Sequence, residues 1–212
     1  LGTEALAATG MGSMMFWGVL SLAIGIRTAV QTVTARRLGQ GLHKESGVAL
    51  RNGLVLATLY SLPTSFFVWK YSDSLARFFI EDPSATPLTT DYVSIVFTGL
   101  LFSSYSFVFQ GFFTGIEKTK IHMKVTITSN VLNVYLNAGL IYGSSGVQEF
   151  FNEQLPILSF LSYLWTWANF PALGVKGAAI GTLISSFWMT AHYAVSLLSV
   201  SYTHLTLPTT SK

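Results

Sequence analysis

Long stretches without a charged residue constrain this 212-residue chain more than any other feature of its sequence. A helix that crosses a bilayer needs about 20 predominantly apolar residues. Only 10% of the residues are charged, against about 25% in an ordinary soluble domain. The chain is therefore predicted to be all-α, a polytopic membrane helix bundle. Six long uncharged runs carry this prediction: Ala5–Ile26, Asn52–Trp69, Tyr92–Ile116, Val125–Gln148, Gln154–Val175 and Gly177–Ser211.

Five membrane-spanning helices are expected from these runs: Ala5–Ala35, Val48–Tyr71, Tyr92–Gly115, Met123–Tyr142 and Lys176–Ser199. The segment Leu155–Phe170 has Pro156 at its start and Pro171 directly after it, and its 16 residues rise only about 24 Å as a helix, short of a ~30 Å hydrocarbon core. It is rich in Trp, Tyr and Phe, which is typical of a segment at the membrane surface. Residues 144–170 are therefore predicted to form an extracytoplasmic insert between spans.

Loop charges predict how the bundle is oriented, because Lys and Arg collect in cytoplasmic loops. Seven basic residues lie around the loops before the second and fourth predicted spans: Arg36, Arg37, Lys44, Arg51, Lys118, Lys120 and Lys124. The alternate loops carry only three basic residues against seven acidic ones, so they are predicted to face outward. The first span then runs inward from outside, and we expect a further span to precede it in the whole protein.

The last residues are expected to be foreign to the protein. Val200–Thr209 reads VSYTHLTLPT, which looks like the in-frame translation of a transposase sequencing adapter. Residues 200–212 are therefore predicted to be a non-native tail, and no function is assigned to them.

Polar side chains recur along the fourth predicted span. Thr126, Asn130, Asn133 and Asn137 follow at spacings of four, three and four, which places them on one helical face. Such a row faces either neighbouring helices, as packing contacts, or a water-filled cavity that holds substrate or ions. Thr182 in the last span can turn toward this face, or its hydroxyl can bond back to its own helix.

Arg27 is a charged residue deep in a predicted span, and an intramembrane Arg is by default a candidate functional residue. Snorkelling toward the cytoplasmic face is the structural alternative. The chain has no cysteine, which excludes disulfides and thiolate metal sites, and no metal site is expected. No Asp or Glu occurs in the runs Tyr92–Ile116 and Val125–Gln148, so we expect no enzyme. The net charge of +3 gives no reason to expect a nucleic-acid partner.

Four stretches, in this order and spacing, resemble the multidrug and toxic compound extrusion (MATE) exporters. The second helix and following loop of that family are similar to GTEALAATGMGSMMFWGVLSLAIGIRTAVQTVTARRLGQG. Its Gly-rich helix end and cytoplasmic turn resemble FQGFFTGIEKTKIHMKV, its fifth helix TSNVLNVYLNAGLIYG, and its sixth LGVKGAAIGTLISS. The resemblance covers about residues 1–143 and 171–199.

This resemblance implies a bacterial inner-membrane antiporter with twelve helices in two lobes. It would export organic, often cationic, drugs in exchange for Na⁺ or H⁺ by alternating access, with no other cofactor. Residues 1–199 would form part of the N-terminal lobe, helices two to six, with the lipid bilayer, the first helix and the second lobe as partners. Asn133 and Asn137 match the family pattern Asn-x-x-x-Asp and Thr182 a polar position, but Asn137 departs from the acidic residue. The alternatives are a lipid-linked saccharide flippase of the same superfamily and a non-transport intramembrane protein.

The loop charges generate a topology prediction. After substitution by Cys, Gln40 and Thr119 should react with a membrane-impermeant maleimide only from the cytoplasm, and Asp82 and Glu149 only from outside. Each site is labelled in whole cells and in inverted vesicles. Labelling of Gln40 in whole cells would overturn the orientation.

Overall fold

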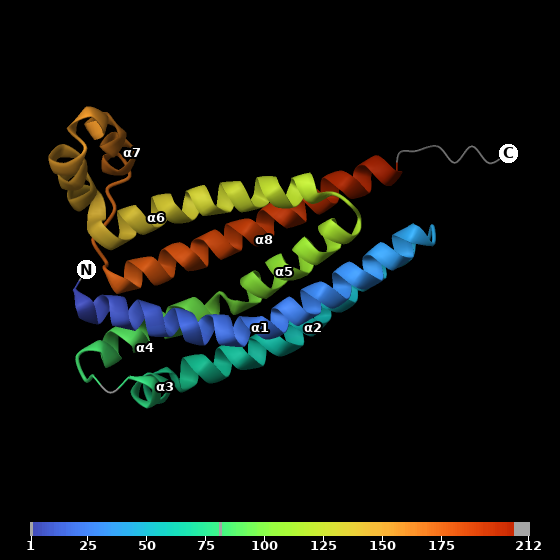
Figure 1. The fold of residues 1–212 in the computed structure, drawn as a ribbon, viewed down its shortest axis with the longest axis horizontal. Coiled ribbons are helices and arrows are strands. Elements are labelled where there is room, and N and C mark those ends of the chain that lie inside the picture. The colour runs from blue at the N-terminus through green and yellow to red at the C-terminus, as the bar shows by residue number, and fades with distance from the viewer. Residues whose placement is uncertain (1, 81, 206–212) are drawn as a thin grey trace.

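A computed structural model describes residues 2–80 and 82–205 as an elongated bundle of helices (Figure 1). The described part contains α-helices and one short 3₁₀-helix and no strand, so the predicted all-α class is confirmed. The elements are α1 (Thr3–Gly39), α2 (His43–Lys70), α3 (Ser72–Phe79), α4 (Ala85–Thr98), α5 (Leu100–Gly115), α6 (Thr119–Gln154), η1 (Pro156–Ser162), α7 (Tyr163–Thr166) and α8 (Val175–Leu205).

The predicted tail falls largely beyond this description. Residues 206–212 lie outside the described residues, and for 200–205 only the backbone is described, as the end of α8. Its non-native origin stays a prediction.

The prediction of one continuous helix for the third span is wrong. Instead of a single helix over Tyr92–Gly115, α4 and α5 meet at Gly99 with a bend of 47°. The Ser65 hydroxyl donates to the carbonyl of Phe97 at 2.7 Å, and a Cβ on residue 99 would lie 2.9 Å from the Leu183 side chain of α8. At the break, the Ser65 hydroxyl thus competes for a helix carbonyl and the Leu183 side chain packs closely against Gly99. A side chain that interrupts the backbone hydrogen bonds is a usual cause of a helix kink.

The other predicted spans correspond to α1, α2, the first part of α6, and α8. Within the part of the chain that the structure describes, α1 alone qualifies as a membrane span by length and apolarity, and α4 with α5 qualifies as a bent pair. The number of helices that cross the membrane therefore stays a prediction.

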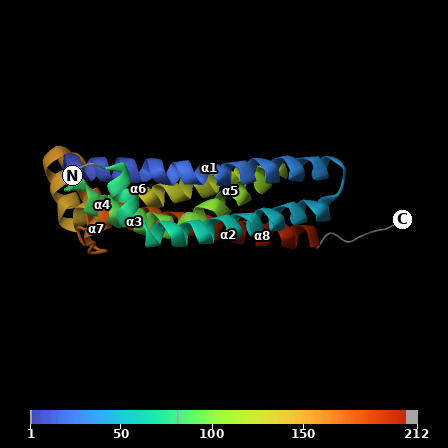
Figure 2. The same ribbon diagram turned by 90° about the horizontal axis from the view of Figure 1, so that it is seen from below.

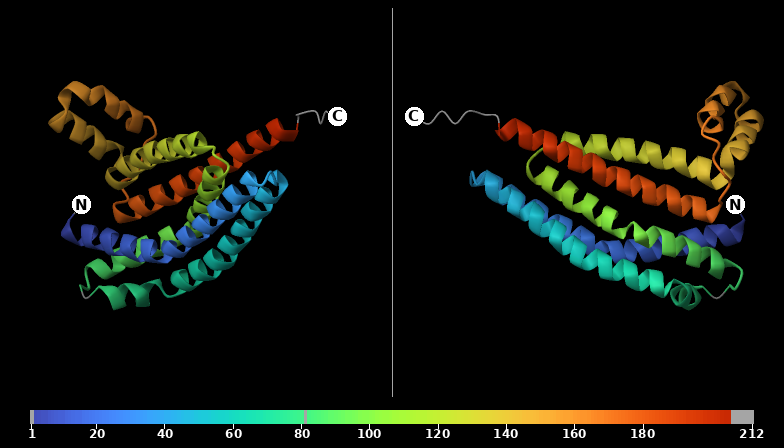
Figure 3. Two further views of the ribbon diagram at one scale, coloured as in Figure 1. Left: turned by 45° about the vertical axis from the view of Figure 1, so that its right-hand side comes forward. Right: turned by 180° about the vertical axis from the view of Figure 1, so that it is seen from behind.

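The helices form two groups that share the long axis of the bundle. The pair α6 and α8 lies on one side, α1 and α2 on the other, with α5 between them (Figures 1 and 3). The start of α1, α3, the start of α4, α7 and the start of α8 gather at one end, which we call the N-terminal end (Figure 2). The α1–α2 and α5–α6 turns lie at the opposite end. The basic loops predicted to face the cytoplasm thus lie at one end of the bundle, and the loops predicted to face outward lie at the N-terminal end.

Two clusters of buried apolar side chains lie along the bundle. One joins α1, α2, α4, α5 and α8 around Phe97 and Leu100, and the other joins α1, α2, α5, α6 and α8 around Val108, Phe113 and Tyr193. Phe97 is packed edge-on against Phe16 of α1, with ring centroids 5.3 Å apart. Since these clusters involve α1, α5 and α8, they hold the two groups of helices together.

Glycines permit the closest helix contacts. A Cβ on Gly111 of α5 would overlap the backbone carbonyl of Arg27 on α1, and one on Gly115 would lie 2.8 Å from the carbonyl of Gln31. These two glycines, four residues apart, therefore let α5 pack closely against α1. On the other side, a Cβ on Gly177 of α8 would overlap the backbone carbonyl of Leu140 on α6.

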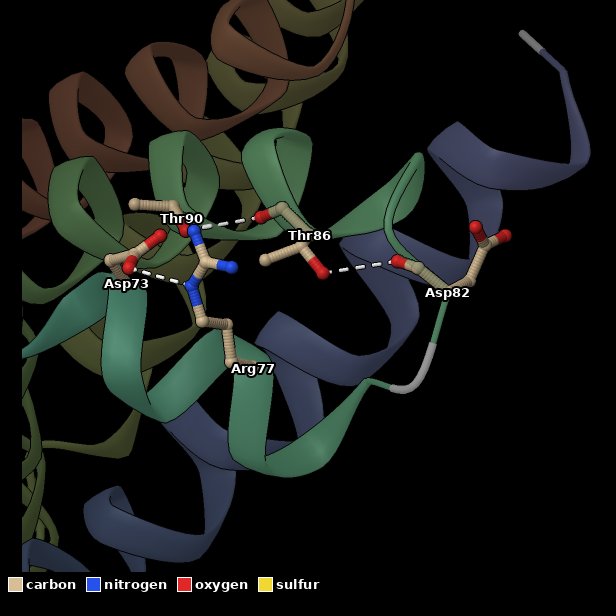
Figure 4. A network of polar contacts seen from close by, with 5 residues as sticks. All are labelled: Asp73, Arg77, Asp82, Thr86 and Thr90. Carbon is tan, nitrogen blue, oxygen red and sulfur yellow. Dashed lines mark hydrogen bonds and ion pairs between the residues drawn. The ribbon is translucent and has the colours of Figure 1, made fainter.

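A polar network covers the N-terminal end where α3 faces the start of α4 (Figure 4). Arg77 donates to Asp73 within α3 at 2.8 Å. The hydroxyls of Thr86 and Thr90 each donate to a carbonyl four residues earlier, those of Asp82 and Thr86, at 3.0 Å. Because the Arg77–Asp73 pair is exposed, it contributes little to stability.

Two further contacts order this end. The Asp82 carboxylate accepts hydrogen bonds from the hydroxyl and the backbone N–H of Ser84, which hold the pKa of Asp82 below its usual range. Lys176 at the start of α8 pairs with Asp91 of α4 at 3.2 Å. This pair links α8 to α4 at the surface.

The glycine contacts generate a stability prediction. Gly177→Ala should destabilise the protein by about 1–3 kcal/mol, because the new methyl group can fit only if α6 and α8 separate. Gly25→Ala is the matched control, since nothing lies within 4 Å of a Cβ there. Thermal unfolding of the purified protein in detergent measures both. Equal melting temperatures for the two variants would contradict the packing described here.

Candidate functional site

The asparagines of α6 form a hydrogen-bonded pair at the contact with α8. The amide nitrogen of Asn137 donates to Oδ1 of Asn133 at 3.1 Å, as the spacing of four residues allows. Both side chains are half-buried. The Oδ1 atom of Asn137 is itself buried and has no hydrogen-bond partner among the described residues. The pair therefore contains a buried amide oxygen whose hydrogen-bonding capacity is unused among the described residues.

Gly181 of α8 makes room for that oxygen. A Cβ on residue 181 would overlap Oδ1 of Asn137, so the amide fits only because residue 181 has no side chain. The carbonyl of Gly181 is occupied by the buried Ser185 hydroxyl, which donates to it at 2.7 Å. The oxygen of Asn137 therefore lies directly against the α8 backbone.

Thr182 takes the second of the two arrangements left open by its sequence. Its hydroxyl donates to the carbonyl of Ala178 in its own helix at 2.9 Å. One turn farther along α8, Ser186 accepts a hydrogen bond from Ser103 of α5 at 3.2 Å. Thr182 and Ser103 therefore both use their hydroxyl protons in hydrogen bonds within the protein. The oxygen atoms of these hydroxyls can still accept hydrogen bonds.

A cavity of about 410 Å³ lies between α1, α4, α5, α6 and α8, within the size range of small-molecule sites. None of the side chains that line it is charged. Four are aromatic: Phe16, Trp17, Tyr92 and Phe107. Seven others carry a hydroxyl or an amide: Ser13, Ser103, Ser106, Gln110, Asn130, Thr182 and Ser186. Such a lining suits an aromatic molecule with a few hydrogen-bonding groups.

The predicted site residues fall into three places. Asn130 and Thr182 line the cavity together, although Asn130 is otherwise exposed. Asn133 and Asn137 form their own pair beside Gly181, next to Thr182 in the chain. Arg27 is half-buried on α1 and is not among the residues that line the cavity. The structure thus brings the α6 and α8 residues together and leaves Arg27 apart from them.

A second polar network was not predicted. The Gln110 side-chain amide lies 2.6 Å from Nε2 of His122, and Nδ1 of His122 lies 2.5 Å from the Tyr193 hydroxyl and 3.2 Å from that of Thr126. These residues come from α5, α6 and α8, so the network joins three helices.

Gln110 connects this network to the cavity that it lines. The sequence could have pointed to Gln110, because it is a polar amide inside the uncharged run Tyr92–Ile116. His122 is close to Lys120 and Lys124 in sequence and gave no such signal, because the partners that it meets are distant in the chain.

The polar groups of the cavity and of the Asn133–Asn137 pair are mainly amides and hydroxyls. Their oxygen atoms suit a small hard cation better than a soft metal ion. Across residues 2–80 and 82–205, no three His, Asp or Glu side chains lie in an arrangement that could hold a metal ion. The chemistry available here is binding by neutral dipoles and aromatic faces.

Comparisons with known proteins are consistent with this arrangement. A family model described as MatE matches residues 1–138. Proteins named "Probable multidrug resistance protein NorM" are similar: that of Synechocystis is 24% identical over 89% of this chain and 36% of its own length, and that of Synechococcus 30% identical over 82% and 36%. A "Multidrug resistance protein NorM" of Burkholderia vietnamiensis is 25% identical over 93% of this chain and 38% of its own length. The chain spans about a third of the length of these relatives, and no solved structure matches it.

Proposed function

The chain belongs to the MatE family, and from that premise we propose that it is part of a multidrug efflux transporter of the bacterial inner membrane. The whole protein exports organic, often cationic, compounds in exchange for Na⁺ or H⁺ by alternating access. This chain supplies most of the first lobe, and a first helix and a second lobe complete the substrate path.

The uncharged, partly aromatic cavity lined by Asn130 and Thr182 is the observation that supports this proposal. Aromatic faces attract organic cations even where no acidic side chain is present. The hydroxyl and amide groups of Asn130 and Thr182 add hydrogen bonds that fix a bound molecule. A lipid-linked saccharide flippase would instead require cationic groups for its anionic substrate, and the lining contains none.

Asn137 bears on the choice of coupling ion. A neutral amide binds Na⁺ through its carbonyl oxygen but carries no proton at ordinary pH. The buried and unpartnered Oδ1 of Asn137 is an acceptor of this kind. We therefore propose that an ion which reaches this position is Na⁺, and that any H⁺ step uses a carboxylate elsewhere in the whole protein.

Efflux by the full-length protein tests the role of the pair. Asn133→Ala and Asn137→Ala should reduce ethidium efflux per folded transporter severalfold, because each substitution removes an amide from the proposed site. Asn137→Asp should make efflux more pH-dependent between pH 6 and 8, since it adds a titratable group. Efflux is measured in cells and divided by the amount of folded protein.

The matched control is Asn152→Ala, the same substitution at an exposed position outside the bundle. It should leave efflux per transporter unchanged. If the pair serves only helix packing, Asn133→Ala and Asn137→Ala will each cost about 0.6–2 kcal/mol of stability and lower the amount of folded protein. Unchanged efflux per folded transporter in all three site variants would remove the pair from the functional site.

A further inference from the structure

The segment after Gly143 leaves the bundle. Gly143 has φ +73°, a backbone conformation that favours glycine, and it interrupts α6. The rest of α6, η1 and α7 project sideways from the N-terminal end, across the long axis of the bundle (Figures 1 and 3). We call residues 144–170 the insert. Gly174, with φ +56°, returns the chain to α8.

The inner side of the insert is fixed to α6. The Trp165 indole N–H donates to the backbone carbonyl of Tyr135 at 2.8 Å, and the Tyr135 hydroxyl donates to the carbonyl of Leu164 at 2.7 Å. The Ser144 hydroxyl donates to the carbonyl of Trp165 at 2.6 Å and accepts the backbone N–H of Phe170 at 2.7 Å. The insert is therefore held in one orientation relative to the bundle.

The outer side of the insert exposes large apolar and aromatic side chains. Ile157 is 89% exposed, Tyr163 and Trp167 are each 71% exposed, and Phe160 is 68% exposed. Surface patches of this kind mark contacts with another molecule or a membrane.

Three features favour a lipid surface as the occupant. From Gln154 to Val175 the chain carries no charge, so the part of the insert after its two glutamates, Glu149 and Glu153, offers nothing to an oppositely charged protein. Its exposed Tyr and Trp combine an apolar ring with a polar group, which suits the headgroup level of a bilayer. The exposed apolar face of α6, formed by Ile127, Val131 and Val134, leads along the helix toward the insert.

We propose that the outer side of the insert lies in the membrane–water interface at the N-terminal end of the bundle, with Ile157, Phe160 and Trp167 in contact with lipid. It thereby anchors the end of α6 that carries the Asn133–Asn137 pair. The proposal depends on the chain lying in a membrane and not on what it transports.

Spin labelling tests the proposal in the full-length protein, reconstituted in phosphatidylcholine vesicles. Because this chain has no cysteine, single Cys substitutions at Ile157, Phe160 and Trp167 each give one labelled site in it. Asn152, an exposed polar residue before η1, is the matched control. The accessibility of each label to oxygen, which concentrates in lipid, is compared with its accessibility to a water-soluble nickel complex.

The ratio of oxygen to nickel accessibility should be severalfold higher at Ile157, Phe160 and Trp167 than at Asn152. Adding phosphatidylglycerol should not change this result, since residues 154–175 carry no charge. High nickel accessibility at all four positions would place the insert in water and overturn the proposal. Low accessibility to both reagents at the three apolar positions would also overturn it, because it would show that protein covers the surface. Labelled proteins that keep the melting temperature of the unsubstituted protein rule out unfolding as the cause.

Discussion

The close approach of α6 and α8 is the constraint on which the candidate site depends. At Gly177 the backbone of α8 contacts the carbonyl of Leu140, and at Gly181 it contacts the side-chain oxygen of Asn137. A side chain at residue 177 would separate the helices, because the Leu140 backbone cannot move aside as a flexible side chain can. A side chain at residue 181 would displace the Asn137 amide. The two glycines lie one turn apart, so they set both the distance between the helices and the register that places Asn137 beside residue 181.

Polar groups inside this bundle show why Asn137 stands out. Hydroxyls in the described part mostly bond to a carbonyl of their own helix or to a hydroxyl across an interface, as Ser61 does with Ser104 at 2.9 Å and Ser106 with Thr190 at 2.9 Å. Burying a polar group without a partner costs free energy. Among the described residues, only Thr34, Ser129 and Asn137 have buried side-chain oxygens without a partner. Asn137 is the one of these whose side chain also donates a hydrogen bond to another asparagine, Asn133.

The helices were predictable because uncharged runs and their flanking charges are local properties of a sequence. The break at Gly99 was not, since it involves the Ser65 hydroxyl and Leu183, from two other helices. The spacing of Asn133 and Asn137 predicted a shared face, and their hydrogen bond agrees with it. The cavity and the Gln110–His122–Tyr193 network were not predictable from spacing, because each is assembled from helices far apart in the chain.

Thermal unfolding of the full-length protein in NaCl and in KCl of equal ionic strength tests the role of Asn137 most directly. A ligand that binds only the folded protein stabilises it, by about 2.7 kcal/mol at a concentration 100 times its Kd. The account predicts that Na⁺ raises the melting temperature relative to K⁺, that Asn137→Ala abolishes this difference, and that Asn152→Ala preserves it. A difference between Na⁺ and K⁺ that persists unchanged in Asn137→Ala, or its absence from the unsubstituted protein, would contradict the assignment of this oxygen to an ion site.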